Sequence, residues 1–585
     1  MVLSCWWSPS ALADESAADA RFRQLWEADW QWRLRQDPQM ASSIGEGDYD
    51  GQLEQVDEAS QHARGKYWRD LASKLKEIDP AQLSKTARAD YAVFEHQIQS
   101  SLDEVRFHGY RMPMNGDSSF YGSIQYWANR LSLESPEAAE NYLKRLAALP
   151  NWYAQHIDNM RAGIEHGQVM PKIVLAGRDQ PLVREAELSD PTHSVFYAPL
   201  AKLPQSWPAA EREDLGKRAA RLIGEKVLPA QRTLLAFLRE EYLPAGRDSI
   251  GAKELPDGMD YYRAQIRRFV TVDMAPEEIH QIGLAEVARI RAQMEAIVAE
   301  LDFDGSFAEF LSFLRTDPQF YAASPHQLLA EASYYAKLID GKLPDYFSTL
   351  PRAPYGVAPV PDSIAPFYTA GRYVPPAREG GAGTYWVNTH KLESRPLYAL
   401  PALTLHEAVP GHHLQGALAS ELSEQPPFRR YSYLSVYGEG WALYTEWLGQ
   451  EMGVYQTPYE HFGRLTYEMW RACRLVVDTG MHTQGWSRQR AYDYMKDNTA
   501  LSEHEIGTEI DRYIGWPGQA LSYKLGELEI RKLRAQAEAE LGPAFDLKAF
   551  HAAILSQGSV TLPVLREAVG EYLRAQKNPD RQSAN

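Results

Sequence analysis

The stretch "LTLHEAVPGHHLQG", Leu403 to Gly416, is the part of this sequence that most strongly constrains its interpretation. It begins like the pattern His-Glu-x-x-His, in which two histidines four residues apart on one helix bind zinc. Pro410 occupies the position of the second histidine, and His412 and His413 follow it. The stretch is therefore a broken metal site, a coincidence, or a metal site with a different geometry.

Neither late histidine fits a regular helix well. His412 comes six residues after His406 and would be turned roughly 120° from it, whereas His413 would share its face but lie ~10 Å along the axis. Proline removes a backbone donor and glycine tolerates unusual dihedral angles, so Pro410 and Gly411 can interrupt the helix. We hypothesise that this interruption brings His412 next to His406.

A third ligand is expected from the downstream stretch "YGEGWALYTEW". A catalytic zinc site usually takes three protein ligands and leaves one position for water. Glu439 is the first carboxylate of this stretch, and Glu446 follows seven residues later on the same helix face. Glu407 should point away from the His406 ring, and we predict that it is the general base toward the attacking water. The alternative is three histidines satisfied by hydrogen bonds in a polar cleft.

Helical periodicity dominates the rest of the chain. Apolar residues recur at helical spacing in 16–36, 84–107, 135–167, 208–242 and 276–301. Ser324 to Gln327 forms a capping box ahead of a further helix. Because strands and helices do not alternate and no fixed-period repeat is present, the sequence predicts a mostly α fold with one small β-sheet.

The non-helical region is rich in proline, glycine and aromatic residues and spans 350–376. Shortly after it, side chains alternate through residues 385–389, which predicts a short strand. At the edge of a sheet such a strand accepts an extended peptide through backbone hydrogen bonds. Tyr385 and Asn388 would then contact a substrate, and a packed loop with a short hairpin is the alternative.

Composition narrows the function further. The formal net charge is −17, which argues against nucleic acid as a partner because phosphate binding needs clustered Lys and Arg. No stretch approaches the ~20 apolar residues of a membrane helix. Cys5 and Cys473 are the only cysteines, so a disulfide framework and a thiolate metal cage are both excluded. Any metal must be held by His, Asp and Glu.

The N-terminus carries features of export. Ala11 to Ala13 resembles the small-residue cleavage site of a secretory signal, but the preceding stretch lacks a basic region. We interpret residues 1–13 as the remnant of a longer signal, and 14–585 as a single catalytic domain, with two helical lobes around a cleft as an option. Cys5 resembles a lipoprotein acylation site. A periplasmic or outer-membrane lipoprotein is therefore expected, and a disordered cytoplasmic start is the alternative.

Four motifs in combination resemble a known bacterial family. They are "HEAVPGHHLQ", "YGEGWALYTE", "RLVVDTGMHTQGWSRQRA" and "EIDRYIGWPGQALSYKLG". The family is the one catalogued as domain of unknown function 885, and the resemblance runs through nearly the whole chain, most densely from Arg372 to Arg534. The family is widely regarded as zinc-dependent and peptidase-like, and several members are classed as lipoproteins.

A more distant similarity concerns "EGWALYTE", which has a glutamate at both ends. It is similar to the third-ligand helix of the thermostable carboxypeptidase Taq family, which, like thimet oligopeptidase and angiotensin-converting enzyme, is mostly helical with a deep cleft. The similarity implies a large helical zinc-peptidase-like fold, Zn²⁺ as cofactor and Glu439 as third ligand. The expanded His-Glu motif departs from it, so the second ligand is open between His412 and His413. We favour His412 because it directly follows Gly411.

Supporting residues are expected in the last third of the chain. Hydrolysis needs a donor that stabilises the oxyanion, and Tyr513, Tyr523 and His482 are candidates, with structural hydrogen bonds as the alternative. Arg512 and Lys524 are candidates for binding the C-terminal carboxylate of a substrate, with internal salt bridges as the alternative.

The sequence thus predicts a zinc metallopeptidase that hydrolyses short peptides, with carboxypeptidase activity as an option. His406, His412 and Glu439 would hold the metal, and Glu407 would accept the proton. Two other functions stay open: a metal-dependent amidase or esterase on non-peptide substrates, and a non-catalytic exported binding protein. A binding protein has no need of a general base, so Glu407 argues against it. The oligomeric state is not predicted.

Overall fold

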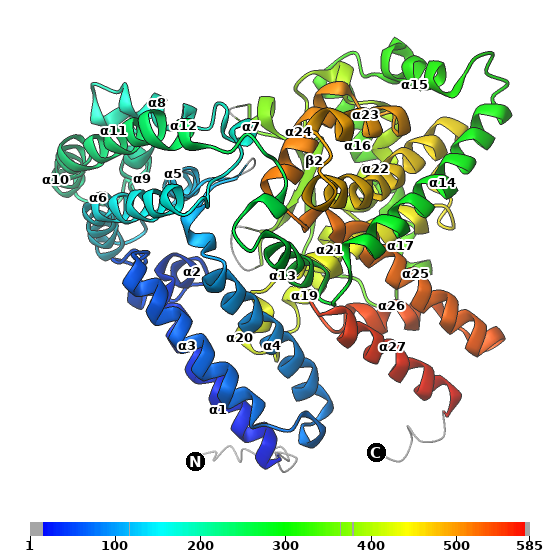
Figure 1. Ribbon diagram of the computed structural model, residues 1–585, viewed down its shortest axis with the longest axis horizontal. Coiled ribbons are helices and arrows are strands. Elements are labelled where there is room, and N and C mark those ends of the chain that lie inside the picture. Colours follow the sequence, from blue (N-terminus) through cyan, green and yellow to red (C-terminus); the bar gives the residue numbers. More distant parts are fainter. Residues whose placement is uncertain (1–15, 116–117, 363, 377–379, 579–585) are drawn as a thin grey trace, which may run out of the picture.

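The computed structural model describes residues 16–115, 118–362, 364–376 and 380–578. The expected cleavage site at Ala11 to Ala13 and the expected acylation site at Cys5 lie outside these residues. Helices from the first 245 residues gather on one side of the molecule, and those after residue 258 gather on the other (Figure 1). The mostly α prediction, with one small sheet, is confirmed.

The first group contains twelve helices among the described residues. They are α1 (Ala17–Gln36), α2 (Pro38–Ser43), α3 (Glu58–Lys76), α4 (Lys85–Arg106), α5 (Phe120–Arg130), α6 (Pro136–Glu165), α7 (Lys172–Leu175), α8 (Gln180–Ala186), α9 (Ala198–Ala201), α10 (Ala209–Leu222), α11 (Leu228–Phe237) and α12 (Leu243–Ala245). Two π-helical segments, η6 (Ile223–Val227) and η7 (Leu238–Tyr242), join the last three into the long helix predicted at 208–242.

The second group carries the sheet and the remaining helices. They are α13 (Gly258–Val270), α14 (Pro276–Glu300), α15 (Phe307–Thr316), α16 (Pro325–Asp340), α17 (Leu343–Tyr346), β1 (Tyr355–Pro359), β2 (Gly371–Val374), β3 (Gly383–Val387), α18 (Leu400–Glu407), α19 (His412–Ser420), α20 (Pro427–Arg430), α21 (Ser435–Leu448), α22 (Pro458–Thr483), α23 (Arg488–Asn498), α24 (Glu503–Gly515), α25 (Ser522–Leu541), α26 (Leu547–Leu555) and α27 (Leu562–Lys577).

Short 3₁₀ turns connect these elements. They are η1 (Gly47–Tyr49), η2 (Pro80–Gln82), η3 (Gly109–Arg111), η4 (Pro191–His193), η5 (Val195–Tyr197), η8 (Ala252–Glu254), η9 (Pro318–Phe320), η10 (Ala365–Phe367), η11 (Leu392–Ser394), η12 (Leu397–Ala399), η13 (Gln519–Leu521) and η14 (Gly542–Ala544).

Helix α16 starts where the sequence predicts, but its cap differs in detail. The Ser324 side chain accepts a hydrogen bond from the Gln327 backbone, as in a capping box. The Gln327 amide oxygen accepts from the Ala323 backbone N–H, one residue before the cap. The expected residues therefore cap the helix, but the Gln327 side chain bonds the backbone of Ala323 instead of that of Ser324.

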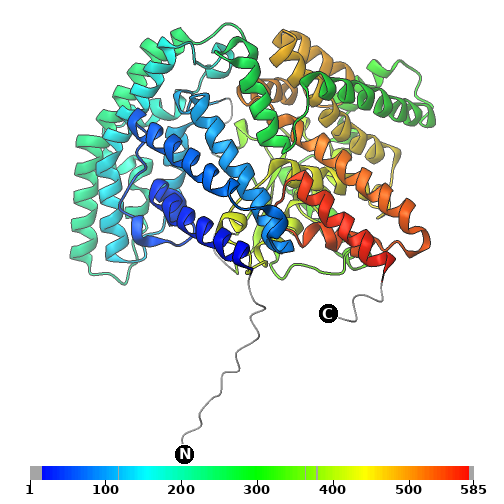
Figure 2. The same cartoon turned by 60° about the horizontal axis from the view of Figure 1, so that its bottom comes forward.

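The two groups of helices are joined along α4 and α20. Phe428 of α20 packs into a cluster formed mainly by α1, α3 and α4, and Arg429 pairs with Asp90 at 2.6 Å. Figure 2 shows the blue N-terminal helices on the same side as the red α27, and Lys85 of α4 pairs with Glu571 of α27 at 2.7 Å. The first and last parts of the chain therefore meet.

The sheet contradicts the expectation of a free edge at residues 385–389. The strand order is β1-β3-β2, with β3 parallel to β1 and antiparallel to β2. Because β3 is central, both of its backbone edges are already paired. Tyr385 and Asn388 are fully buried, and the Asn388 amide donates to three backbone carbonyls of residues 365–369. They hold the sheet and the preceding loop together, rather than lining an open edge.

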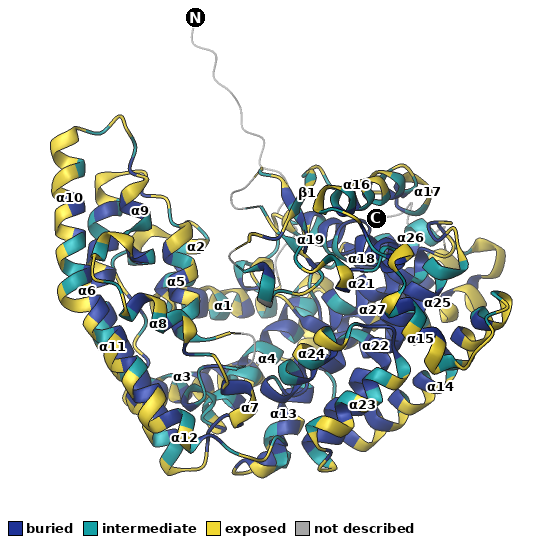
Figure 3. Cartoon of the chain, turned by 90° about the horizontal axis from the view of Figure 1, so that it is seen from above, coloured by how far each residue is buried: buried dark blue, intermediate teal, exposed yellow. Residues whose placement is uncertain are grey.

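Helix α22 is the centre of the second group. All of its residues from 462 to 482 are buried, and it packs along α14 on one side and beneath α18 and α25 on others. Figure 3 shows the buried residues concentrated around α18, α21 and α22. The helices with the predicted metal ligands therefore lie against the core of this group.

Helices α21 and α25 cross at a pair of glycines. A Cβ on Gly440 would lie 2.6 Å from backbone carbons of Gly526, and a Cβ on Gly526 would overlap the Val436 carbonyl oxygen. Only glycine allows the two backbones to approach this closely. The crossing fixes the position of Glu439, which is next to Gly440, relative to Tyr523 of α25.

We predict that Gly440→Ala destabilises the protein, although alanine is the better helix former by ~1 kcal/mol. The added methyl group would force α21 and α25 apart, at a cost of about 1–3 kcal/mol in the free energy of unfolding. Thermal or denaturant unfolding measures the change. Gly356→Ala is the matched control, because its Cβ would meet no atom within 4 Å. Equal stability of the two variants would contradict a close glycine crossing.

The described helices include none that is both long and apolar enough to cross a membrane.

Candidate metal centre

The chain bends sharply between α18 and α19. Helix α18 ends at Glu407, and α19 begins at His412. The Val409–Pro410 peptide bond is cis, and the Trp441 indole N–H of α21 donates to the Pro410 carbonyl at 2.8 Å. The predicted interruption at Pro-Gly is therefore present, and a tryptophan of the second motif holds it.

Gly411 is needed at this bend because the backbone of α18 lies too close to leave room for a side chain. A Cβ there would overlap the carbonyl oxygen of His406. Its backbone angles, φ −75° and ψ −129°, lie outside the helical and extended regions, so the predicted unusual dihedral angle is present together with the lack of space.

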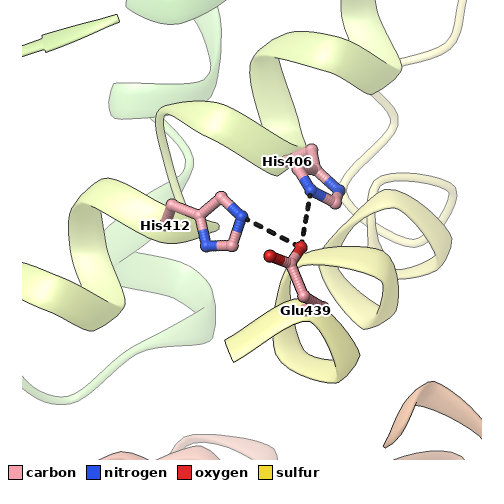
Figure 4. Close-up of side chains that lie close together, drawn as sticks. All are labelled: His406, His412 and Glu439. Atoms are coloured by element: carbon pink, nitrogen blue, oxygen red, sulfur yellow. Dashed lines mark ion pairs between the residues drawn. The ribbon is translucent and has the colours of Figure 1, made fainter. Parts of the chain in front are cut away.

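The bend brings His412 to His406 and both to Glu439 of α21 (Figure 4). The His406 Nε2 lies 3.5 Å from Glu439 Oε2, and the His412 Nε2 lies 3.4 Å from the same oxygen. One ligand atom from each residue lies within 4.8 Å of the others. Donors held at ~2.0–2.1 Å in a tetrahedron lie ~3.3 Å apart, so the two nitrogen–oxygen separations fit a zinc ion.

His413 faces the opposite way. Its ring is buried, lies 4.6 Å from the Tyr355 ring, and has its Nδ1 3.3 Å from the Tyr373 hydroxyl. Burial lowers the pKa of His413 to about 4, so its ring is neutral at physiological pH. The structure thus separates the two adjacent histidines: His412 joins the cluster, and His413 packs against the sheet.

A buried carboxylate orients the His406 ring from behind. Glu446 Oε1 lies 2.7 Å from His406 Nδ1, which leaves Nε2 to face Glu439 and His412. Arg471 of α22 lies 3.4 Å from the same carboxylate oxygen. A carboxylate on the far nitrogen of an imidazole is the usual support of a metal-binding histidine. The sequence placed Glu446 on the face of Glu439 but gave no role to either Glu446 or Arg471.

The charges of the cluster suit a cation. Burial alone would raise the pKa of Glu439, but the two imidazoles beside it hold that pKa well below its usual range. Burial likewise opposes protonation of His406, yet Glu439 and Glu446 raise its pKa to about 9. Without a metal, protons therefore provide the positive charge that these carboxylates need, and a metal ion would replace them.

Glu407 lies next to the cluster without joining it. Its Oε2 accepts a hydrogen bond from the Tyr373 backbone N–H of β2 at 2.8 Å. This bond fixes the position of the carboxylate. Sequence reasoning also missed Tyr433, which precedes α21 and donates to Glu439 Oε1 at 2.9 Å with 59% of its surface exposed.

The structure separates the two candidate tyrosines. The Tyr523 ring is partly exposed and stacks 6.4 Å from the His406 ring. Tyr513 is 1% exposed and donates to Glu509 at 2.7 Å, while Arg474 donates to its hydroxyl. Tyr523 is therefore beside the cluster, whereas Tyr513 belongs to an internal network behind it.

His482, Lys524 and Arg512 also lie in internal networks. His482 is fully buried; its Nδ1 accepts from a backbone N–H, so its Nε2 donates to a carbonyl. Lys524 is fully buried among three glutamates at 2.9–3.0 Å. Arg512 donates to Glu509 and to Gln519, each at 2.9 Å. These side chains already have partners, which corrects the expectation that they face a substrate.

Comparison with known proteins places the chain in a bacterial group. Residues 38–569 match the family described as "Bacterial protein of unknown function (DUF885)". "The crystal structure of the putative lipoprotein from Colwellia psychrerythraea" is similar with 28% identity and a TM-score of 0.87, over 95% of this chain and 99% of that one.

A second solved structure shares the fold. It is "a putative lipoprotein of unknown function from Shewanella oneidensis", with 20% identity and a TM-score of 0.72, over 93% of this chain and 99% of that one. A carboxypeptidase from Pyrococcus furiosus aligns at 12% identity and a TM-score of 0.36, over 96% of this chain and 98% of that one. No curated protein matches the chain significantly.

Proposed function

The chain belongs to the DUF885 family of bacterial proteins, and on that premise we propose that it is a zinc-dependent peptidase acting on short peptides. The observation that carries the proposal is the convergence of two imidazoles and one carboxylate at 3.4–3.5 Å. This is a donor set of catalytic zinc sites, with three protein ligands and a free position.

His406, His412 and Glu439 would hold the zinc. The ion, when bound, supplies a Lewis acid that lowers the pKa of water and polarises a carbonyl group. Glu446 keeps the proton of His406 on Nδ1, so that Nε2 offers its lone pair. Arg471 lies 3.4 Å from the same Glu446 oxygen and helps to hold the carboxylate in place.

Glu407 is the proposed general base. Its carboxylate is anchored to β2 through the Tyr373 N–H, so it accepts a proton from water and passes it to the leaving amine. Tyr523 carries a hydroxyl near the cluster and is suited to donate to the developing oxyanion, whereas the exposed Tyr433 already donates its hydroxyl proton to Glu439.

The substrate class and location rest on resemblance. The similarity of "EGWALYTE" to the carboxypeptidase Taq helix supports a peptide substrate, with carboxypeptidase activity as the first mode to test. The two similar structures are described as lipoproteins, which supports an exported protein with a lipid anchor at Cys5. One hydrophobic core cluster runs from Leu53 to Leu573, which supports a single catalytic domain with two helical lobes.

The proposal is tested by metal analysis of the purified chain together with its products from a peptide pool. We expect about one zinc per chain and cleavage of free peptides that stops after treatment with a chelator. Peptides blocked at either end reveal the end preference. If peptides survive while acyl amides or esters are hydrolysed by the same metal, the site is an amidase or esterase. If the zinc-loaded protein has no hydrolase activity, the remaining interpretation is a non-catalytic binding protein.

We predict that Glu446→Gln weakens metal binding without removing a ligand. The amide cannot accept and stabilise the His406 proton as the carboxylate does, and loss of such a partner costs about 10–100-fold in metal affinity. Competition with a chelating dye measures the effect. Glu451→Gln is a control on the same segment, since Glu451 pairs with Arg534. Equal affinities of the two variants would exclude an orienting role for Glu446.

A further inference from the structure

A cavity lies about one helical turn from the metal centre. It contains about 570 Å³ of empty space, its opening to solvent included. Leu400 and Leu403 of α18 form part of its wall, and Leu403 precedes His406 by three residues, or ~4.5 Å along the helix. Other parts of the wall come from the end of β3, the segment before α18, α22, the start of α24, and Leu328 of α16.

Four polar side chains that line this cavity have buried atoms without a hydrogen-bond partner. They are Arg395 Nε, Tyr398 Oη, Thr466 Oγ1 and Glu505 Oε1. The first three side chains belong to residues that are 8%, 4% and 2% exposed. Burying such groups without partners is unfavourable, and more so when the group is charged. Close packing does not explain why four such polar atoms line the same cavity.

The two charged groups are the most informative. The Arg395 guanidinium forms no hydrogen bond or ion pair with any described residue, and neither does the Glu505 carboxylate. They line one cavity without pairing with each other; burial raises the pKa of the Glu505 carboxyl, and the positive charge of Arg395 opposes that rise. Other buried charges among the helices after residue 258, such as Lys524 and Glu468, form close ion pairs. Among the described residues that line the cavity, one guanidinium and one carboxyl group thus have no side-chain partner, and they lie with two hydroxyls and leucine side chains.

We propose that this cavity binds a free α-amino acid with an aliphatic side chain. The ligand's carboxylate would meet Arg395, which suits planar anions, and its ammonium group would meet Glu505 and the two hydroxyls. The aliphatic side chain would contact Leu400 and Leu403. A ligand with only one charge would leave the opposite group buried and unpaired. This site needs no metal and stands independently of the proposed peptidase activity.

The first test is titration calorimetry of the full chain with L-leucine, leucinamide and N-acetyl-leucine. Leucinamide lacks the carboxylate, and N-acetyl-leucine lacks the ammonium group. We expect leucine to bind and each analogue to bind ~10-fold or more weakly, since each analogue loses one of the two charge-assisted contacts. Equal binding of N-acetyl-leucine would identify a site for a peptide C-terminus, and equal binding of leucinamide one for an N-terminus. Either result, or no binding of leucine, overturns the proposal.

The second test compares variants by thermal unfolding and leucine titration. Arg395→Gln and Glu505→Gln should each lose leucine binding at least ~10-fold while the ligand-free melting temperature stays equal or rises, because an unpaired buried charge is removed. The matched control is Arg315→Gln: Arg315 donates to the carbonyls of Leu501 and Lys496, so its loss should lower the melting temperature. If Arg395→Gln and Glu505→Gln destabilise as much as the control, or still bind leucine normally, the two charges are structural and the proposal fails.

Discussion

His412→Ala should remove zinc from the protein and abolish hydrolysis, whereas His413→Ala, one residue away, should keep both. His412 Nε2 lies 3.4 Å from Glu439, while His413 packs against Tyr355 and Tyr373 on the other side of α19. With one of three protein ligands missing, the other two cannot complete the coordination of the metal. The zinc content should fall from about one per chain to near zero.

The measurement is metal analysis of both variants beside the unchanged protein, with unfolding curves for each. His413→Ala is the control for the loss of an imidazole from α19, and it should lose stability through its cavity while retaining zinc. The opposite result, zinc lost with His413 and retained without His412, would mean that the bend between α18 and α19 is not the geometry of the metal-bound protein.

Glu407→Gln should retain zinc and lose hydrolysis by ~10²–10⁴-fold, the usual cost of removing a general base. Glutamine keeps the shape of the side chain and still accepts the hydrogen bond from the Tyr373 N–H, but it cannot take a proton from water. The effect should appear in kcat with little change in KM, because the residue acts on the reaction rather than on substrate binding.

A surface carboxylate provides the comparison for this variant. Glu421 follows α19 and pairs with Arg352 on the surface, so Glu421→Gln should leave zinc content and turnover unchanged. Near-normal turnover of Glu407→Gln would assign the proton transfer to another group. A loss of zinc in the same variant would show that Glu407 supports the metal itself.

Local sequence was enough to predict the helices and the break in the key motif. The periodic segments at 208–242 and 276–301 are helical, since a continuous amphipathic pattern encodes its own structure. Pro410 and Gly411 stand where a helix cannot continue, and the structure bends there. The spacing of Glu439 and Glu446 placed both on one face of α21, which is how both reach His406.

The sequence was less informative about residues whose partners are distant in the chain. Lys524 resembled a substrate ligand because a lone lysine in a motif gives no sign of its partners, which come from α14, α22 and α25. The strand at 383–387 resembled an edge because the strands that cover it, β1 and β2, carry irregular sequences rich in proline and glycine.

The sequence by itself therefore determined a mostly helical fold, the interruption at Pro410-Gly411 and the set of groups able to bind a metal. Only the tertiary structure decided which of these groups face one another. It turned His412 toward Glu439 and His413 toward the sheet, and the Gly440–Gly526 crossing put Tyr523 beside the cluster. The physical reason is that backbone conformation follows from neighbours along the chain, whereas the direction of a buried charge follows from the packing of helices far apart in sequence.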